Sequence, residues 1–270
     1  MSDDPFYVSA KKSLGQHFLN SPVVPRWLCE AAHLTAGETV LEIGPGTGVL
    51  TAELLARGAV VHAVETDERS CEVLARRFTS EIAAKQLYVH HHDIRHDLPE
   101  LINHLGQYKI VANIPYYLSG YILRLCLTHP KHPSSMTLLM QKEVVERITR
   151  EPKTSLLQLS VNVFGATRYV RTVKPGHFNP PPRVDSAIIH IYSINHEQLP
   201  LAQHDTFFQL LHVGFAHKRK QLQSNLRRQY DSATLENAFG VCKIAPTIRA
   251  EEVSLATWLH LHHLLTTPNT

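Results

Sequence analysis

The residues best suited to chemistry are Asn113, Ile114, Pro115 and Tyr116, which follow a short apolar run beginning at Lys109. Such a run is typical of a buried strand, and open α/β sheets place ligands at the carboxyl ends of their strands. Pro115 has no N–H and biases Ile114 toward an extended backbone, so the carbonyls are free to turn outward. The Asn113 amide oxygen and the Ile114 carbonyl are then two acceptors for one amino group, and Tyr116 offers a face to a planar base. An ordinary strand followed by a proline turn is the competing interpretation of so short a motif.

A glycine-rich loop lies upstream, between a predicted strand over 39–43 and a predicted helix over 49–57. It contains Gly44, Gly46 and Gly48. This order of strand, glycine turn and helix is typical of nucleotide-cofactor loops, because glycine lets the backbone approach a ligand that a Cβ would block. Ordinary tight turns share the pattern, so the loop alone does not decide the function.

Two carboxylates follow the next two predicted strands, over 59–64 and 87–90. Glu65 lies about 20 residues after the glycine loop, where a carboxylate accepts both hydroxyls of a ribose. A solvated surface charge is the alternative, and the pairing with the glycine loop favours the ribose. Asp93 is placed to accept from the amino group of an adenine.

The run His90-His91-His92 looks like a metal site. Adjacent residues of a strand point to opposite faces, however, so these rings do not converge on one ion. The sequence also lacks the His-Glu-x-x-His pattern of a zinc helix. We therefore predict no metal.

The segments that must position these residues alternate between strand and helix patterns, which predicts a doubly wound, mostly parallel α/β sheet of the Rossmann-like type. The polar stretch 193–203 marks a domain boundary. We expect a catalytic domain over 1–195 and a small all-helical domain over 196–270. Further predicted helices cover 22–33, 67–78, 118–127, 156–164, 205–216, 218–228, 233–239 and 253–265, and a helix starts over 141–147. Further predicted strands cover 135–140, 169–173 and 184–192.

A proline-rich loop joins the last two predicted strands. Pro180, Pro181 and Pro182 make this loop extended and stiff. We expect it to hold Phe178 against the pocket of Tyr116, although a plain rigid connector fits the segment equally well.

A basic stretch lies in the predicted helical domain. Its helical spacing would place much of the charge on one side, and no acid balances it, which favours contact with RNA phosphates over a solvated face. The five cations are Lys218, Arg219, Lys220, Arg227 and Arg228.

The composition of the 270 residues bounds the classes of function. The formal charge of +3 permits a nucleic-acid partner without requiring one. No apolar run of about 18 residues occurs, and no export signal begins the chain, so we expect a cytoplasmic protein that does not span a membrane. The four cysteines lack pair spacing, which fits reduced thiols; they are Cys29, Cys71, Cys126 and Cys242.

These motifs, in this order, resemble the KsgA (RsmA) family of small-subunit ribosomal RNA adenine dimethyltransferases. The resemblance covers nearly the whole chain. It implies an S-adenosylmethionine-dependent enzyme that dimethylates N6 of two adjacent adenosines in the 3′-terminal hairpin of 16S rRNA, late in small-subunit maturation. The partner is then 16S rRNA in the immature small subunit, with the protein acting as a monomer. The matching segments are 15–19, 42–48, 113–116, 141–143, 178–187 and 249–252.

The resemblance also implies which residues contact the cofactor. Some relatives have Asn where His17 stands, so its contact then runs through the backbone or another ring atom. The residues implied are His17, Leu19, Gly44, Gly46, Glu65, Asp93 and Asn113.

Two alternatives to this function stay open. Ile114 in place of Leu also occurs in the related Erm enzymes, which modify 23S rRNA; the segments 141–143 and 184–187 favour the KsgA family. The second alternative is a ribosome assembly factor that retains the fold but does not catalyse methyl transfer. The intact 113–116 motif and glycine loop argue against that second alternative.

Overall fold

The structure, a computed structural model, describes residues 6, 8–11 and 15–266. The chain forms two compact units, Met1–Glu146 with Ala166–Ile194, and Arg147–Gly165 with Asn195–Thr270. The division after Ile194 falls at the expected boundary near 195, whereas 147–165, expected in the first domain, group with the second unit. Hydrogen bonds explain this grouping: Thr154 N donates to the Glu251 carbonyl over 2.9 Å, and Asn195 N donates to the Phe164 carbonyl over 2.9 Å.

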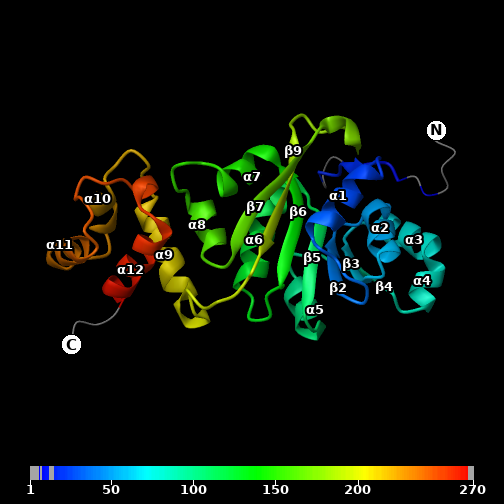
Figure 1. The fold of residues 1–270 in the computed structure, drawn as a ribbon, viewed down its shortest axis with the longest axis horizontal. Coiled ribbons are helices and arrows are strands. Elements are labelled where there is room, and N and C mark those ends of the chain that lie inside the picture. Colours follow the sequence, from blue (N-terminus) through cyan, green and yellow to red (C-terminus); the bar gives the residue numbers. More distant parts are fainter. Residues whose placement is uncertain (1–5, 7, 12–14, 267–270) are drawn as a thin grey trace. The chain divides into compact units, whose positions relative to one another are not determined.

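A seven-stranded sheet in the order β4-β3-β2-β5-β6-β9-β7 forms the centre of the first unit (Figure 1). The five strands from β4 to β6 are parallel, whereas β9 runs antiparallel to both β6 and β7. This arrangement is the doubly wound, mostly parallel sheet predicted from the sequence. The strands are β2 (Thr39–Ile43), β3 (Val60–Glu65), β4 (Leu87–His91), β5 (Tyr108–Asn113), β6 (Ser135–Gln141), β7 (Ala166–Val173) and β9 (Ser186–Tyr192).

Helices connect these strands, and the first three pack on one face of the sheet around a common apolar core. Alternate strand residues, such as Val111, Leu139 and Ile188, contribute to that core, as expected for side chains that alternate between faces. The helices are α1 (Val23–Ala31), α2 (Val49–Ala56), α3 (Glu68–Arg77), α4 (Thr79–Ala83), α5 (Leu98–His104), α6 (Ser119–Thr128) and α7 (Lys142–Thr149). The short α4 and α5 had no counterpart among the predicted elements.

The strand order reverses between β2 and β5, because β3 follows β2 on one side and β5 lies on the other. Such a switch point opens a crevice at the carboxyl ends of the strands. The glycine loop leaves β2 and the 113–116 motif leaves β5 at this point. The topology therefore brings two segments about 70 residues apart in sequence to one edge of the sheet.

A separate two-stranded sheet ties the start of the chain to the proline-rich loop. β1 (Phe18–Leu19) pairs antiparallel with β8 (Phe178–Asn179), and Leu19 lies opposite Phe178. Both side chains are buried, Leu19 at 7% exposure and Phe178 at 2%, within the core shared with α1. The Asn20 N–H also donates to the His177 carbonyl over 3.1 Å.

The second unit is helical. Side-chain caps start two of its helices: Ser155 accepts from Gln158 N at α8, and Asp231 accepts from Thr234 N at α11. Its helices are α8 (Leu156–Asn162), α9 (His204–Gly214), α10 (Leu222–Leu226), α11 (Ser232–Val241) and α12 (Leu255–Thr266).

The predicted helix over 218–228 is wrong in most of its length, since α10 covers only Leu222–Leu226. Lys218, Arg219 and Lys220 lie in the turn before it. Asn225 explains the turn, because its buried side chain donates to the Gly214 carbonyl over 2.7 Å and to the His217 carbonyl over 3.3 Å. Those carbonyls are therefore held by a side chain and not by a continuing helix.

The four cysteines are free thiols. Within the part of the chain that the structure describes, no helix is long and apolar enough to cross a bilayer.

Gly48 gives a test of the packing under the glycine loop. Its φ is +83°, and a Cβ built there would lie 2.5 Å from the Phe78 ring and 2.8 Å from Leu74. Gly48→Ala should lower the free energy of unfolding by backbone strain and by a further ~1–3 kcal/mol of overpacking. Gly37→Ala is the matched control, because its φ is +84° and nothing lies within 4 Å of its Cβ. Equal losses of stability in denaturant melts would contradict the packing account.

Candidate active site

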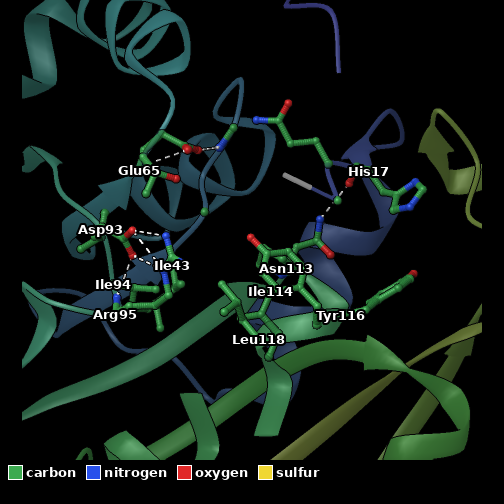
Figure 2. Close-up of a pocket in the computed structure, with 18 of the residues that line it drawn as sticks. His17, Ile43, Glu65, Asp93, Ile94, Arg95, Asn113, Ile114, Tyr116 and Leu118 are labelled. Atoms are coloured by element: carbon green, nitrogen blue, oxygen red, sulfur yellow. Dashed lines mark hydrogen bonds and ion pairs between the residues drawn. The ribbon is translucent and has the colours of Figure 1, made fainter. Parts of the chain in front are cut away.

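A cavity of about 300 Å³ opens at the carboxyl ends of the parallel strands in the first unit (Figure 2). Predicted residues from five segments line it together, namely His17, the glycine loop, Glu65, Asp93 and the whole 113–116 motif. The lining residues are Gly15, Gln16, His17, Phe18, Ile43, Gly44, Gly46, Val64, Glu65, Thr66, His92, Asp93, Ile94, Arg95, Asn113, Ile114, Pro115, Tyr116, Tyr117 and Leu118.

Glu65 connects the glycine loop to the turn after β3 through its carboxylate. Its Oε2 accepts from the Gly46 N–H over 3.1 Å, and its Oε1 accepts from the N–H groups of Thr66 and Asp67 over 2.8 and 2.9 Å. Burial raises the pKa of Glu65, and these hydrogen bonds oppose the rise. The carboxylate is only 6% exposed yet has acceptor capacity left on Oε2 toward the cavity.

Glu42 is a second buried carboxyl near Glu65. Its Oε2 accepts from the Thr51 hydroxyl over 2.7 Å, while its Oε1 has no hydrogen-bond partner among the described residues. Burial raises the pKa of Glu42 to about 8, and the neighbouring Glu65 charge adds to the rise. Glu42 is therefore mostly protonated at neutral pH. Glu42 is not among the residues that line the cavity.

Asp93 lines the cavity but is already paired. Arg95 donates to both of its carboxylate oxygens, from its backbone N over 2.9 Å and from its guanidinium over 3.0 and 3.1 Å (Figure 2). This pairing holds the pKa of Asp93 at about 2. Arg95 also lines the cavity, although no sequence pattern assigned it to the site. Its position two residues after the predicted Asp93 was the only available signal.

Asn113 is oriented by the N-terminal segment. Its Nδ2 donates to the His17 carbonyl over 3.1 Å, which leaves its Oδ1 as an acceptor (Figure 2). Ile114 and Pro115 line the cavity beside it, so the two predicted acceptors share one wall.

Tyr116 is fixed at both ends. Its hydroxyl is 2.6 Å from the Ser186 hydroxyl, and its ring stacks with the His17 ring at 5.7 Å between centroids. The other side of His17 lies near the proline-rich loop, where Nδ1 is 2.8 Å from the Pro180 carbonyl. Burial raises the pKa of Tyr116, so its phenol stays protonated at neutral pH. The ring of His17 therefore packs on Tyr116, and its backbone carbonyl contacts Asn113.

Two predicted site residues lie elsewhere. The interpretation of Phe178 as a wall of the Tyr116 pocket needs correction, because Phe178 is buried in the core opposite Leu19 in the β1–β8 pair. Leu19 is buried in the same core and is not among the residues that line the cavity. Both side chains pack in the apolar core between α1 and the sheet. The sequence pattern did not indicate this contact.

The site includes further residues that no sequence pattern indicated. Tyr117 lines the cavity with 60% of its surface exposed, directly after the predicted motif. Ser186 lies in the segment 184–187, which indicated the family but no role for this hydroxyl. Gln16 and Lys11 hold the N-terminal segment by donating to the Asp67 carboxylate over 3.2 and 3.3 Å.

The histidine run divides as strand geometry requires. His90 lies beside His62, with 3.1 Å between Nε2 and Nδ1, and His91 is 3.3 Å from the Thr66 carbonyl instead. Among residues 8–11 and 15–266, no three His, Cys, Asp or Glu side chains form a group that could hold a metal ion.

The raised pKa of Glu42 makes stability depend on pH. The folded protein binds a proton that the unfolded chain loses at about pH 4.5, so the free energy of unfolding should fall as pH rises from about 4.5 to about 8. The slope contributed by one group is at most about 1.4 kcal/mol per pH unit. Glu42→Gln should remove this slope in denaturant melts between pH 5 and 9, whereas Glu72→Gln, on the exposed side of α3, should keep it. Parallel curves for wild type and Glu42→Gln would refute the assignment.

Comparison with known proteins places this geometry in a family. The sequence profile described as "Ribosomal RNA adenine dimethylase" matches residues 8–267. A curated protein of Dehalococcoides mccartyi named ribosomal RNA small subunit methyltransferase A is 38% identical, over 95% of this chain and 88% of the relative. A protein of Rippkaea orientalis with the same name is 36% identical, over 95% and 98%.

Solved structures agree with the profile. A dimethyladenosine transferase from Plasmodium falciparum superposes with a TM-score of 0.71 at 26% identity, covering 91% of this chain and 96% of that one. The 23S rRNA methyltransferase ErmE superposes with a TM-score of 0.70 at 25% identity, covering 93% and 100%. The Rossmann-like methyltransferase fold and the near-complete match of the sequence show that the chain belongs to the ribosomal RNA adenine dimethylase family.

Proposed function

We propose that the protein transfers methyl groups from S-adenosylmethionine to N6 of two adjacent adenosines in the 3′-terminal hairpin of 16S rRNA. The observation that carries the proposal is the shared cavity: the 113–116 motif forms one wall and Glu65 with Asp93 the other. A cofactor and an amino group can therefore meet within one space. We infer the RNA substrate and the methyl-transfer activity from the names of the curated relatives and of the family.

The residues of the cavity fit the proposed cofactor. Gly46 has a positive φ of +58°, and its N–H bonds Glu65, so the loop presents backbone close to the cavity. Glu65 accepts the ribose hydroxyls with its remaining capacity, and Asp93 accepts from the adenine amino group after yielding part of its pairing with Arg95. Gly44 lines the cavity and offers its backbone groups to the cofactor. His17 contributes through its carbonyl, whereas Leu19 supports the site from the core.

The chain's contribution to methyl transfer is orientation. Adenine N6 is a poor nucleophile because its lone pair is delocalised into the ring. The Asn113 Oδ1 and the Ile114 carbonyl hold the two amino hydrogens, so the lone pair points toward the cofactor side of the cavity. The two oxygens also stabilise the positive charge that develops on N6. The bound cofactor supplies an electrophilic methyl group, and the surplus proton leaves to water, so no side chain must act as a base.

Tyr116 holds the target base. An adenine inside a stacked hairpin must leave its stack to reach the cavity, and an aromatic face compensates for the lost stacking. The packing of the His17 ring against Tyr116, with 5.7 Å between ring centroids, supports this role. The bond to Ser186 keeps the ring of Tyr116 in place.

The second unit supplies RNA contact in this proposal. Lys218, Arg219, Lys220, Arg227 and Arg228 are exposed and form no ion pair among the described residues. Cations in this state neutralise phosphates at little desolvation cost. We propose further that the substrate is the immature small subunit, that the protein acts as a monomer without a metal, and that it works in the cytoplasm, where that subunit matures.

An Erm-like activity on 23S rRNA is the alternative with a specific observation behind it, namely the superposition with ErmE. The higher identity to relatives named for the small subunit favours 16S rRNA. One experiment decides: incubate the protein with labelled S-adenosylmethionine and unmodified small or large subunits. Label in 16S rRNA supports the proposal, label in 23S rRNA supports the alternative, and no label with intact cofactor binding indicates an assembly factor.

Glu65→Ala should weaken cofactor binding by about 1.5–3 kcal/mol, the worth of hydrogen bonds to a charged group. The variant also removes the hydrogen bond that the Gly46 N–H donates to the Glu65 carboxylate. Calorimetry with S-adenosylmethionine measures the effect. Glu72→Ala is the control, because Glu72 is exposed on α3 and does not line the cavity. Unchanged affinity in Glu65→Ala would reject the ribose contact.

Asn113 and Tyr116 should fail in different ways. At saturating cofactor, Asn113→Ala should lower turnover about 10²–10³-fold, since one preorganised polar partner is removed. Tyr116→Ala should weaken target binding by roughly 1–3 kcal/mol, the worth of the stacking it removes. Tyr116→Phe should keep most activity, and Ser186→Ala, which removes the same hydrogen bond, should match it. The assignment fails if Asn113→Ala turns over like wild type, or if Tyr116→Phe is as impaired as Tyr116→Ala.

The basic residues predict a salt effect. Replacing Lys218, Arg219 and Lys220 by Gln should weaken binding to small subunits and flatten its salt dependence by roughly one unit of slope for each phosphate that the protein no longer neutralises. A control with Arg76, Lys85 and Lys131 replaced by Gln removes equal charge from the first unit. If both triple variants show the same slope, the residues form a solvated face.

A further inference from the structure

A second hollow, of about 290 Å³, lies in the first unit between α1 and the edge strand β7. It shares no lining residue with the active-site cavity. Its walls combine a partly exposed tryptophan with two exposed arginines and one carboxylate. The lining residues are Trp27, Glu30, Ala31, Arg168, Tyr169, Val170 and Arg171.

A break in strand register creates this arrangement. Arg168 and Arg171 are three residues apart, so a regular strand would direct them to opposite faces. The pairing of β7 with β9 shifts between Tyr169 and Arg171, where Ile189 and Ile188 are consecutive partners. Val170 is thus the extra residue of a bulge, which re-aims the side chain that follows. Both arginines consequently line one hollow.

Glu30 also lines the hollow, but among the described residues it forms no ion pair with either arginine. Neither Arg168 nor Arg171 forms an ion pair with any residue that the structure describes. The Arg171 guanidinium lies 4.3 Å over the Trp27 ring, and the His177 ring makes a T-shaped contact with the Trp27 ring, with 5.8 Å between centroids. An aromatic face flanked by guanidinium groups is the combination that holds single-stranded nucleic acid: cations for phosphates and a ring for a base.

Backbone contacts connect this hollow to the active site. His177, which faces Trp27, accepts from Asn20 N over 3.1 Å. The adjoining β8 pairs with β1, and Phe18 of β1 lines the active-site cavity together with its neighbour His17. A strand of RNA that enters the cavity can therefore continue over this one unit.

We propose that the hollow between α1 and β7 binds an unpaired segment of the RNA substrate, with phosphates on Arg168 and Arg171 and a base against Trp27. The proposal rests on the proposed rRNA methyltransferase function and names a contact outside its active site and outside the basic residues of the second unit. The bound base takes the place of the Arg171 guanidinium on the Trp27 ring, and the freed guanidinium turns to a phosphate.

Tryptophan fluorescence tests the contact directly, because the chain has only two tryptophans. Trp258 is fully buried in the second unit, so Trp27 is the accessible reporter. The probe is the 3′-terminal 16S rRNA hairpin with its single-stranded flank. Wild-type fluorescence should be quenched as this RNA is added, and Trp27→Phe should lose the quenching while keeping cofactor binding and the melting temperature.

Charge variants test the phosphate contact. Arg168→Gln with Arg171→Gln should weaken binding of the probe about 10-fold or more and lower the salt slope by roughly two units. Arg76→Gln with Lys85→Gln removes equal charge at α3 and α4 and should stay close to wild type. Equal affinities of the two double variants, or a Trp27 signal that does not respond to RNA, would overturn the proposal. Equal quenching by polyaspartate would overturn the contact with a base.

The outcome is separable from that of the proposed function. If wild-type protein labels 16S rRNA but Trp27 does not respond, only the hollow is rejected. If wild-type protein labels neither subunit RNA, the methyltransferase function is rejected, and a Trp27 response to RNA would still support the hollow as an RNA site.

Discussion

The buried carboxylate of Glu65 connects two segments that line the cavity, the glycine loop and the turn after β3. It accepts from the glycine loop at Gly46 and from the turn after β3 at Thr66 and Asp67. Desolvation disfavours its charge, and the three N–H groups offset that penalty while fixing the loop. A carboxylate at 6% exposure thus gives the cavity rigidity as well as an acceptor.

The cavity wall formed by the 113–116 motif depends on a different interaction, the hydrogen bond between Asn113 at the end of β5 and the His17 carbonyl. Asn113 donates to the His17 carbonyl, and the β1–β8 pair anchors the N-terminal segment on the core. The amide oxygen of Asn113 faces the cavity only while this hydrogen bond exists. The N-terminal segment is therefore part of the site, and its residues lie far from the motif in sequence.

How far the sequence predicts the site depends on the range of the interactions. The parallel strands β2 to β6 and the positions of Glu65, Asp93 and the 113–116 motif follow from local patterns and from the rule that strand carboxyl ends share an edge. The structure confirms the fold and brings these residues to one cavity. The prediction for Phe178 was wrong because this side chain packs near α1, about 150 residues earlier in the chain. The sequence of a proline-rich loop does not indicate which distant segment the loop packs against.

The sequence by itself determined the alternation of strands and helices, the glycine loop and the polar residues that end the strands, because periodicity and chain direction fix them. Only the tertiary structure decided that Asn113 donates to the His17 carbonyl and that Asn225 holds the turn carrying Lys218. It also decided that 147–165 join the second unit and that a bulge at Val170 turns Arg171 to the same hollow as Arg168. Each of these outcomes is a choice among partners distant in sequence or a shift of register by one residue. Such choices depend on the free energy of the assembled packing, which no local pattern contains.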